Sequence, residues 1–266
     1  MLRIEFLGSP YSGKSFIKSD IKKTFICKKY NFYSYRNFFN HHLNKYQKLN
    51  IIDQLIFNSI NLKETNKLSK NQNDSIYLFK YLKLIVEGLS TRRILLLKKN
   101  IYKNFSKENQ ELTKLIKLFF KKNKFKKLRK NELERWFVEI CTSYFIFTKL
   151  KSPYVAILDS EGFIHRLNSF IINNYDESFI NDYLEVAPKP NILIYIDEKY
   201  QICRKRLINE NLNQNIIKYK DTLETYSINS ELIYNKIKNK NLKIFRVNSE
   251  NYYEEKHKIL KYINEN

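Results

Sequence analysis

The sequence predicts an α/β domain in which a five-stranded parallel sheet, doubly wound, carries helices on both faces. Three observations lead to this prediction. A glycine-rich loop stands between an apolar, strand-like segment and a helical segment near the start of the chain. Short apolar runs recur downstream, and two of them end in a carboxylate. Helix-period patterns separate these runs, which is typical of parallel strands joined by crossover helices.

The glycine-rich loop is the most specific motif of the chain. Residues 8–15 read Gly-Ser-Pro-Tyr-Ser-Gly-Lys-Ser and fit the pattern G-x-x-x-x-G-K-[ST], the Walker A motif. They hold two of only four glycines in 266 residues. The segment Leu2–Leu7 reads as a strand before the loop, and the chain from Phe16 onward reads as a helix after it. In that setting consecutive backbone N–H groups surround the phosphates of a nucleotide.

The loop therefore predicts bound ATP and Mg²⁺. Lys14 would reach the β- and γ-phosphates, and the Ser15 hydroxyl would bind Mg²⁺. The residues expected to hold the nucleotide are those of the whole loop: Gly8, Ser9, Pro10, Tyr11, Ser12, Gly13, Lys14 and Ser15.

The remaining elements follow from local patterns. Residues at helix period from Leu133 to Phe145 form an apolar stripe, and Tyr253–Ile263 reads as a closing helix. Arg3 and Glu5 are unusual in the first strand, because central parallel strands are normally apolar throughout. Four further segments read as strands of the same sheet: Asn31–Tyr35, Val155–Asp159, Ile192–Asp197 and Leu242–Val247.

A helical, basic insertion or lid is expected over residues 37–130, with the α/β core that carries the glycine-rich loop formed by residues 1–36 and 131–266. The insertion contains no clear strand, and Lys121–Lys130 is basic enough to predict a mobile loop. Three segments within it read as helices: Ile51–Leu62, Ser75–Leu89 and Gln110–Phe120. We expect this region to form a lid or one wall of an acceptor site.

Charge is the strongest bias of the composition. The formal net charge is +22, and Lys98–Lys130, with 13 basic and 2 acidic residues, supplies half of it. Such a charge is typical of proteins that bind nucleic acid or anionic membranes. The abundance of Lys, Asn, Ile, Tyr and Phe also fits an AT-rich genome, which would raise the Lys count without a basic function. We favour the second interpretation.

Cysteine usage and hydropathy favour a cytoplasmic protein. Cys27, Cys141 and Cys203 are odd in number and widely spaced, as expected of reduced thiols. No Cys/His spacing indicates a zinc site, no segment reads as a signal peptide, and no apolar run is long enough for a transmembrane helix. Whether the chain forms a homodimer stays open.

A second motif follows the segment Val155–Asp159. The chain continues as Ser-Glu-Gly-Phe-Ile-His-Arg from Ser160 to Arg166. Ligands of open α/β sheets bind beyond the carboxyl ends of the strands, so Asp159 and Glu161 should lie near the loop. One carboxylate would hold Mg²⁺ through water, and the other would orient or deprotonate an acceptor hydroxyl. We expect Asp159 to be the metal residue beside Ser15. Arg166 would bind an anionic group.

Together these motifs resemble the phosphate-loop kinases of the nucleoside monophosphate kinase type, closest to thymidylate-kinase-like proteins. The resemblance covers roughly residues 1–36 and 133–263 and is also seen, more loosely, with kinase-like proteins encoded among bacterial surface-polysaccharide genes. It departs from the family at Tyr11, where a Gly is usual, and in lacking D-R-[YH] after the middle strand. The spacing from Asp197 to Arg206 matches the family's D-x-x-x-x-x-x-x-x-R, so the resemblance implies a phosphate-covering lid with Arg204 and Arg206.

The sequence thus predicts an ATP- and Mg²⁺-dependent phosphotransferase. Its expected catalytic residues are Lys14, Asp159, Glu161, Arg166, Arg204 and Arg206, and its expected partner is a small anionic acceptor: a nucleotide, nucleoside or phosphorylated sugar. Two alternatives stay open. One is a nucleic-acid-binding NTPase or polynucleotide kinase that uses the basic region, and the other is a regulatory module that binds nucleotide without turnover.

Overall fold

The structure, a computed structural model, describes residues 2–25, 31–35, 37–38, 96, 98–150, 155–209, 219 and 221–265. The helices predicted over Ile51–Leu62 and Ser75–Leu89, and Cys27, lie outside these residues. Most of the predicted insertion does too, so the division of the chain at residues 36 and 131 stays a prediction.

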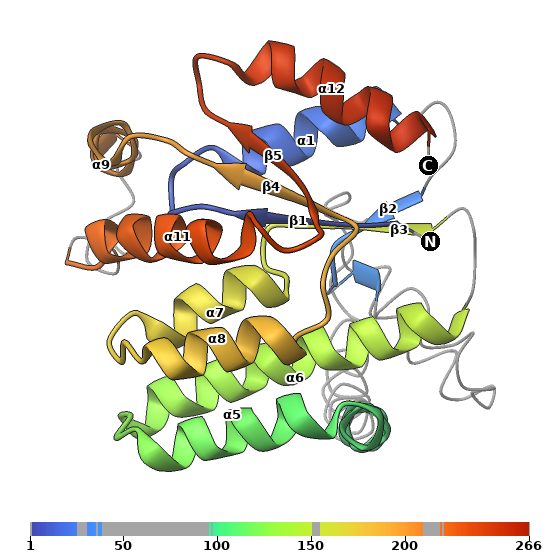
Figure 1. The fold of residues 1–266 in the computed structure, drawn as a ribbon, viewed down its shortest axis with the longest axis vertical. Helices are drawn as coiled ribbons and strands as arrows, with labels where there is room; N and C mark the ends of the chain where they lie inside the picture. Colours follow the sequence, from blue (N-terminus) through green and yellow to red (C-terminus); the bar gives the residue numbers. More distant parts are fainter. Residues whose placement is uncertain are drawn as a thin grey trace, which may run out of the picture.

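A five-stranded sheet forms the centre of the described part of the chain (Figure 1). Every strand pairs in parallel with its neighbours, in the order β2-β3-β1-β4-β5. The predicted fold class is confirmed. The strands are β1 (Leu2–Leu7), β2 (Asn31–Tyr33), β3 (Val155–Asp159), β4 (Ile192–Ile196) and β5 (Lys243–Val247).

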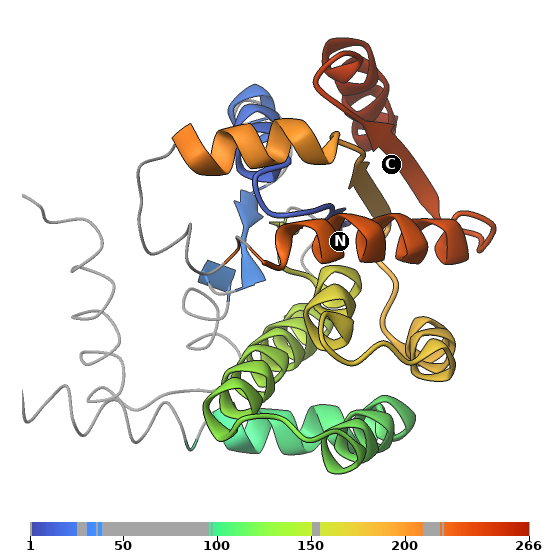
Figure 2. The same ribbon diagram turned by 90° about the vertical axis from the view of Figure 1, so that its left-hand side faces the viewer.

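Helices cover both faces of this sheet (Figures 1 and 2). On one face lie α1 (Lys14–Phe25) and α12 (Tyr252–Glu265). On the other lie α7 (Phe163–Ile171) and α11 (Leu223–Ile237), with α8 (Glu177–Val186), α6 (Lys127–Leu150) and α5 (Gln110–Lys122) below them. The short helix α9 (Tyr200–Asn209) follows β4 beyond the carboxyl end of the sheet.

The alternation of side chains along β1 explains this arrangement. Leu2, Ile4 and Phe6 belong to the core under α1 and α12. Arg3 and Glu5 point to the opposite face, since successive side chains of a strand alternate. Both are buried, with 3% and 0% of their surface exposed. The two polar residues that looked out of place in a central strand therefore face α6 and α7.

Specific partners compensate for burying these two charges. The Arg3 guanidinium lies 4.7 Å from the centre of the Tyr144 ring, and its Nε lies 3.5 Å from the Glu5 carboxylate. Glu5 also accepts a 2.8 Å bond from the Tyr35 hydroxyl and a 3.1 Å bond from the backbone N–H of Ile164, in the first turn of α7. Glu5 thus occupies the place of a helix-capping side chain, which Gly162 at the N-cap cannot supply. A Cβ on Gly162 would lie 2.0 Å from the Glu5 Cδ, so only glycine fits there.

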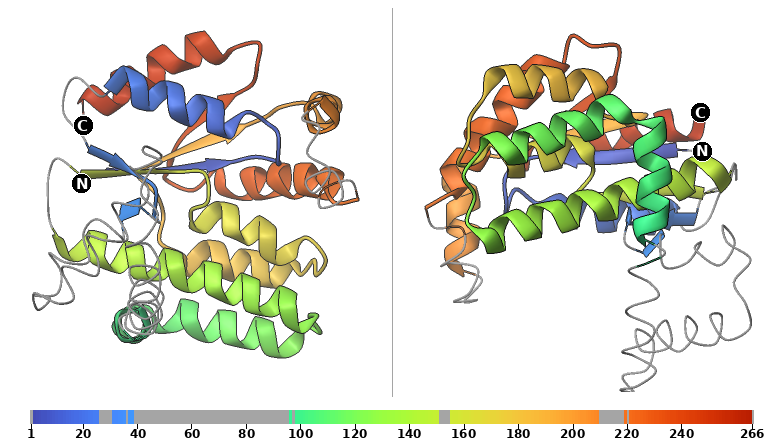
Figure 3. Two further views of the ribbon diagram at one scale, coloured as in Figure 1. Left: turned by 180° about the vertical axis from the view of Figure 1, so that it is seen from behind. Right: turned by 90° about the horizontal axis from the view of Figure 1, so that it is seen from below.

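The basic segment Lys121–Lys130 is more ordered than predicted. The helix predicted over Gln110–Phe120 is confirmed as α5, which continues to Lys122, and α6 begins at Lys127. Only residues 123–126 form a loop, so the prediction of a ten-residue loop is wrong. Aromatic packing holds this turn, because the Phe119 ring lies 5.7 Å from that of Phe125 and stacks at 4.0 Å on that of Phe179 in α8. Figure 3 shows α5 and α6 alongside α7 and α8.

Among the described residues, no helix has the length and apolar character needed to cross a lipid bilayer. Cys141 and Cys203 are buried free thiols.

Candidate active site

The glycine-rich loop connects β1 to α1 at the carboxyl edge of the sheet, as its sequence context predicts. Gly8 has a φ of +152°, and a Cβ there would lie 2.9 Å from the carbonyl oxygen of Ile196. Gly13 has a φ of +100°. Tyr11, in the position where the resembling kinases carry glycine, has a φ of +63° and is the only described residue other than glycine in the left-handed region. The loop thus keeps its tight course despite this substitution.

Lys14, the first residue of α1, turns back onto its own loop. Its ammonium donates hydrogen bonds of 2.8 Å to the Gly8 carbonyl and 2.5 Å to the Ser9 carbonyl. Burial lowers the pKa of Lys14 to about 8. A phosphate beside this ammonium would stabilise its charged form, because an opposite charge offsets the cost of desolvation.

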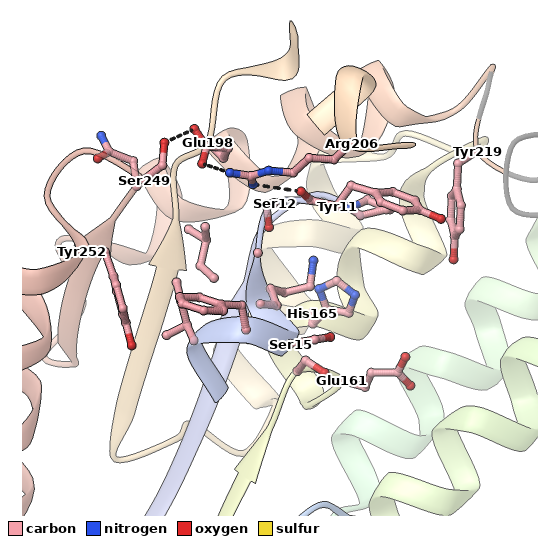
Figure 4. Close-up of a pocket in the computed structure, with 18 of the residues that line it drawn as sticks. Tyr11, Ser12, Ser15, Glu161, His165, Glu198, Arg206, Tyr219, Ser249 and Tyr252 are labelled. Carbon is pink, nitrogen blue, oxygen red and sulfur yellow. Dashed lines mark hydrogen bonds and ion pairs between the residues drawn. The ribbon is translucent and has the colours of Figure 1, made fainter. Parts of the chain in front are cut away.

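A cavity of about 910 Å³ opens over this loop, and we call it the loop cavity (Figure 4). Its walls come from the carboxyl ends of four neighbouring strands and the helices that follow them. They include residues 10–17 from the loop and α1, Ser160 and Glu161 after β3, Glu198 after β4, and Asn248 and Ser249 after β5. The Ser12 Oγ in this wall is buried and has no hydrogen-bond partner among the described residues. It is therefore available to donate to a bound phosphate.

One of the two arginines expected in a lid lies over the loop. The Arg206 guanidinium donates a 3.2 Å bond to the Tyr11 carbonyl and a 3.1 Å bond to the Glu198 carboxylate, which in turn accepts a 3.1 Å bond from the Ser249 hydroxyl. These contacts hold Arg206 in the wall of the loop cavity (Figure 4). Arg204, on the same helix, is exposed and does not line this cavity. Residues two positions apart on a helix point to different faces. Arg206 therefore faces the loop cavity, and Arg204 does not.

Asp159 ends β3 as a buried carboxylate with fixed orientation. Its side chain is 6% exposed and accepts a 2.6 Å bond from the backbone N–H of Tyr35 and a 3.2 Å bond from that of Glu161. Burial raises the pKa of Asp159 to about 6, although these two bonds oppose the shift. Lys18, one turn after Lys14, also opposes it, and its ammonium lies 3.5 Å from the Ser160 hydroxyl. A carboxylate with such a pKa is suited to accept a proton near neutral pH.

Glu161 and Arg166 form an ion pair across the first turn of α7. The Glu161 side chain is 58% exposed, whereas Arg166 is 7% exposed and stacks on the only tryptophan, with its guanidinium 4.4 Å from the Trp136 ring centre. Arg166 therefore holds Glu161 at the mouth of the site while remaining buried itself.

A second cavity, of about 410 Å³, lies on the other side of Glu161, and we call it the side cavity. It is lined by Tyr35 from the end of β2, by Asp159 and Arg166, and by α6 residues including Arg135, Trp136 and Glu139. Glu161 lines both cavities, so the two spaces are neighbours on either side of this residue. The structure thus brings Asp159, Glu161 and Arg166 together beside the loop, as the sequence predicts.

Several residues of the site were not predicted, yet two signals in the sequence point to them. Glu198, Asn248 and Ser249 directly follow predicted strands, so the rule that ligands bind at the carboxyl ends of strands would include them. Lys18 lies four residues after Lys14 and shares its helix face. No local pattern identifies Tyr35 or Trp136, because their place in the side cavity depends on how β2 and α6 pack.

The oxygen atoms around the loop suit Mg²⁺, which prefers hard oxygen ligands and keeps several waters. The Ser15 hydroxyl and the Glu161 carboxylate both line the loop cavity, whereas Asp159 lines the side cavity. No group of three or more His, Cys, Asp or Glu in the described part of the chain could by itself enclose a metal. A metal here would depend on phosphate oxygens for most of its ligands.

Comparison with known proteins gives structural neighbours only. No protein-family model matches the chain, and no curated protein matches it. Its solved neighbours include deoxyadenosine kinase from M. mycoides with bound dCTP, at a TM-score of 0.44 and 14% identity over 100% of both chains. The same kinase with the products dCMP and a flexible dCDP gives a TM-score of 0.43 and 12% identity over 100% of both chains. With bound dATP it gives a TM-score of 0.42 and 12% identity over 99% of this chain and 100% of that one. Similarity with such low TM-scores and identities assigns no function to this chain. The fold described above rests on the strand order and on the geometry of the glycine-rich loop.

Proposed function

We propose that this chain is an ATP- and Mg²⁺-dependent kinase that transfers the γ-phosphate to a hydroxyl group of a small acceptor, namely a nucleotide, a nucleoside or a phosphorylated sugar. One observation carries the proposal: Glu161 lines both the loop cavity and the side cavity. A nucleotide held by the loop and an acceptor held beside Asp159 would meet at this side chain. Holding two reactants in contact accounts for much of the rate gain of a phosphotransferase.

In the proposed reaction the loop cavity binds the phosphate donor. Lys14 would exchange its bonds to the Gly8 and Ser9 carbonyls for bonds to the β- and γ-phosphates. The unpartnered Ser12 hydroxyl and the N-terminus of α1 would add donors to the same phosphates. Arg206 would neutralise charge that spreads over the transferred group.

The side cavity would bind the acceptor. Asp159, which is held by two backbone N–H groups, would accept the proton of the attacking hydroxyl. Trp136 lines this cavity with the Arg166 guanidinium packed on its ring, and it would contribute an aromatic side chain to the contact with a base or a sugar ring. Arg135 is exposed at the rim and has no ion-pair partner among the described residues, which favours an acceptor that carries a phosphate.

Magnesium would be held by the Ser15 hydroxyl and, through water, by Glu161. When bound, it would neutralise negative charge on the β- and γ-phosphates. This gives Asp159 the role of base and Glu161 the role of metal contact, whereas from the sequence alone Asp159 is expected with Ser15 at the metal and the identity of the base stays open. The reason for the change is that Glu161 shares the loop cavity with Ser15 and Asp159 does not.

A substrate screen tests the proposal. The purified chain would be incubated with ATP, Mg²⁺ and single nucleosides, nucleoside monophosphates and sugar phosphates, and phosphorylated products would be identified by mass spectrometry. Lys14→Ala is the matched control, because it removes the ammonium that would contact the phosphates, a group outside the hydrophobic core, and should leave the fold intact. Acceptor binding can be followed separately by the fluorescence of Trp136, the only tryptophan. Equal product formation by wild type and Lys14→Ala would contradict the kinase assignment.

A further inference from the structure

His165 is a buried polar side chain in the wall of the loop cavity. It lies in the first turn of α7 and is 9% exposed. Figure 4 shows its ring among the residues of this cavity, which also include Ser15 and Glu161. Its Nδ1 atom is buried and has no hydrogen-bond partner among the described residues. Buried polar groups are nearly always paired, so an unpaired nitrogen on a ring that lines a cavity indicates a hydrogen bond made only when a ligand is bound.

The surroundings of His165 define what that atom must be. The two charged side chains that act on it are Lys14, from the loop, and Arg166, one residue along α7. Burial, together with the positive charges of Lys14 and Arg166, holds the pKa of His165 well below its usual range, so its ring is neutral. A neutral imidazole carries one N–H donor and one acceptor nitrogen, and only the acceptor nitrogen could pair with Lys14 or Arg166. Lys14 and Arg166 have no acceptor atoms, so the N–H donor requires an acceptor from elsewhere, and a positively charged setting favours an anionic one.

We infer that His165 contacts the transferred phosphoryl group and donates a hydrogen bond to one of its oxygens between Lys14 and Glu161. This inference rests on the proposed function and adds a catalytic residue to it. The position of His165 supports the γ-phosphate over the others. It lies on α7, on the β3 side of the cavity with Glu161, the residue that lines both the loop cavity and the side cavity. The backbone donors of the loop would surround the β-phosphate.

A neutral donor has a distinct effect on binding. It exerts little long-range attraction on a nucleotide, unlike Lys14 or Arg206. It contributes only when an oxygen lies within hydrogen-bond distance. His165 should therefore distinguish ATP from ADP, because only ATP places a phosphate beside the ring.

The test compares affinities for ADP and for β,γ-imido-ATP, measured by calorimetry with Mg²⁺ for wild type, His165→Ala, His165→Asn and His165→Gln. His165→Ala should weaken binding of the ATP analogue about tenfold or more, the range for a hydrogen bond to a charged group, and change ADP binding less than about twofold. At least one of the amide variants, which retain an N–H donor, should recover part of the preference. His257→Asn, on the exposed face of α12, is the control and should behave as wild type.

Three outcomes would overturn the inference. Equal weakening of both nucleotides in His165→Ala would mean that the residue only supports the fold. An unchanged preference for the ATP analogue would mean that it makes no phosphate contact. A wild-type protein that binds neither nucleotide would overturn the proposed function itself, and with it this role. If His165→Ala does not fold, His165→Phe, which keeps an aromatic ring and removes both nitrogens, carries the same comparison and is judged by the same outcomes.

Discussion

The backbone N–H of Tyr35, just beyond the end of β2, donates a 2.6 Å hydrogen bond to the carboxylate of Asp159 at the end of β3. The hydroxyl group of the same tyrosine donates a 2.8 Å bond to Glu5 in β1. One residue thus connects the buried charge of the central strand with the carboxylate that we propose as the base. The bond to Asp159 comes from the main chain, so a substitution can remove the Glu5 contact and leave the Asp159 contact in place.

Tyr35→Phe should therefore lower stability more than activity. The variant leaves a buried carboxylate oxygen of Glu5 without its hydroxyl donor, which costs roughly 1–3 kcal/mol of unfolding free energy. Turnover should stay within about threefold of wild type, as the backbone N–H of residue 35 remains. Chemical denaturation and steady-state kinetics measure the two effects, with the exposed Tyr175→Phe as the control. Unchanged stability would show that the bond to Glu5 contributes nothing to folding.

Removing either carboxylate at the end of β3 should reduce phosphoryl transfer without removing nucleotide binding. Asp159→Asn and Glu161→Gln should each lower turnover at least about a hundredfold, the scale of a general base or a lost metal contact. ATP should still bind, because the loop and Lys14 are unchanged. Full activity in both variants would place the chemistry elsewhere in the chain.

Catalysis and ATP binding should depend on pH in two separate ways, one below about pH 6 and one above about pH 8. Asp159, with a pKa of about 6, is deprotonated above that pH, so kcat/KM for the acceptor should fall as the pH drops below about 6. Lys14, with a pKa of about 8 in the free protein, loses its charge above that pH, so affinity for ATP should fall as the pH rises beyond about 8. Kinetics and binding measured from pH 5 to 9.5 separate the two effects. In the residual activity of Asp159→Asn the fall at acidic pH should be absent, and its persistence would assign it to another group.

The basic turn between α5 and α6 should affect association rather than folding. Replacing Lys121, Lys122, Lys126 and Lys127 with Gln should raise the KM for an anionic acceptor several-fold, and added salt should reduce the difference from wild type, since these charges act over a distance. The Lys122–Asp176 ion pair, at 2.8 Å, is largely exposed on the lysine side, and such pairs add little stability.

A function in nucleic-acid binding would give a different result for the variant in which the four lysines are replaced. We expect weak binding of oligonucleotides by wild type near physiological salt. Tight, steeply salt-dependent binding of single-stranded DNA or RNA that the four substitutions remove would instead favour a polynucleotide-binding NTPase.

The sequence by itself determined the features that depend on neighbouring residues. The strands Leu2–Leu7 and Val155–Asp159 match the prediction residue for residue, and the closing helix is confirmed with one extra residue at its start and two at its end. The loop was recognisable because its glycines adopt backbone angles that other residues avoid. The carboxylates after β3 were predictable because the carboxyl ends of parallel strands share one edge of the sheet. Their chemical roles, and the role of the predicted insertion, stay predictions.

Tertiary structure decided which side chains meet. The strand order places β2 beside β3, and this brings Tyr35 to Asp159 across 124 positions of sequence. The pitch of α9 turns Arg206 toward the loop and Arg204 toward solvent. Packing of α6 under α7 places Trp136 against Arg166 and gives the side cavity one of its walls. Such contacts depend on the direction of each side chain in the folded molecule, and a local pattern of residue types does not contain that direction.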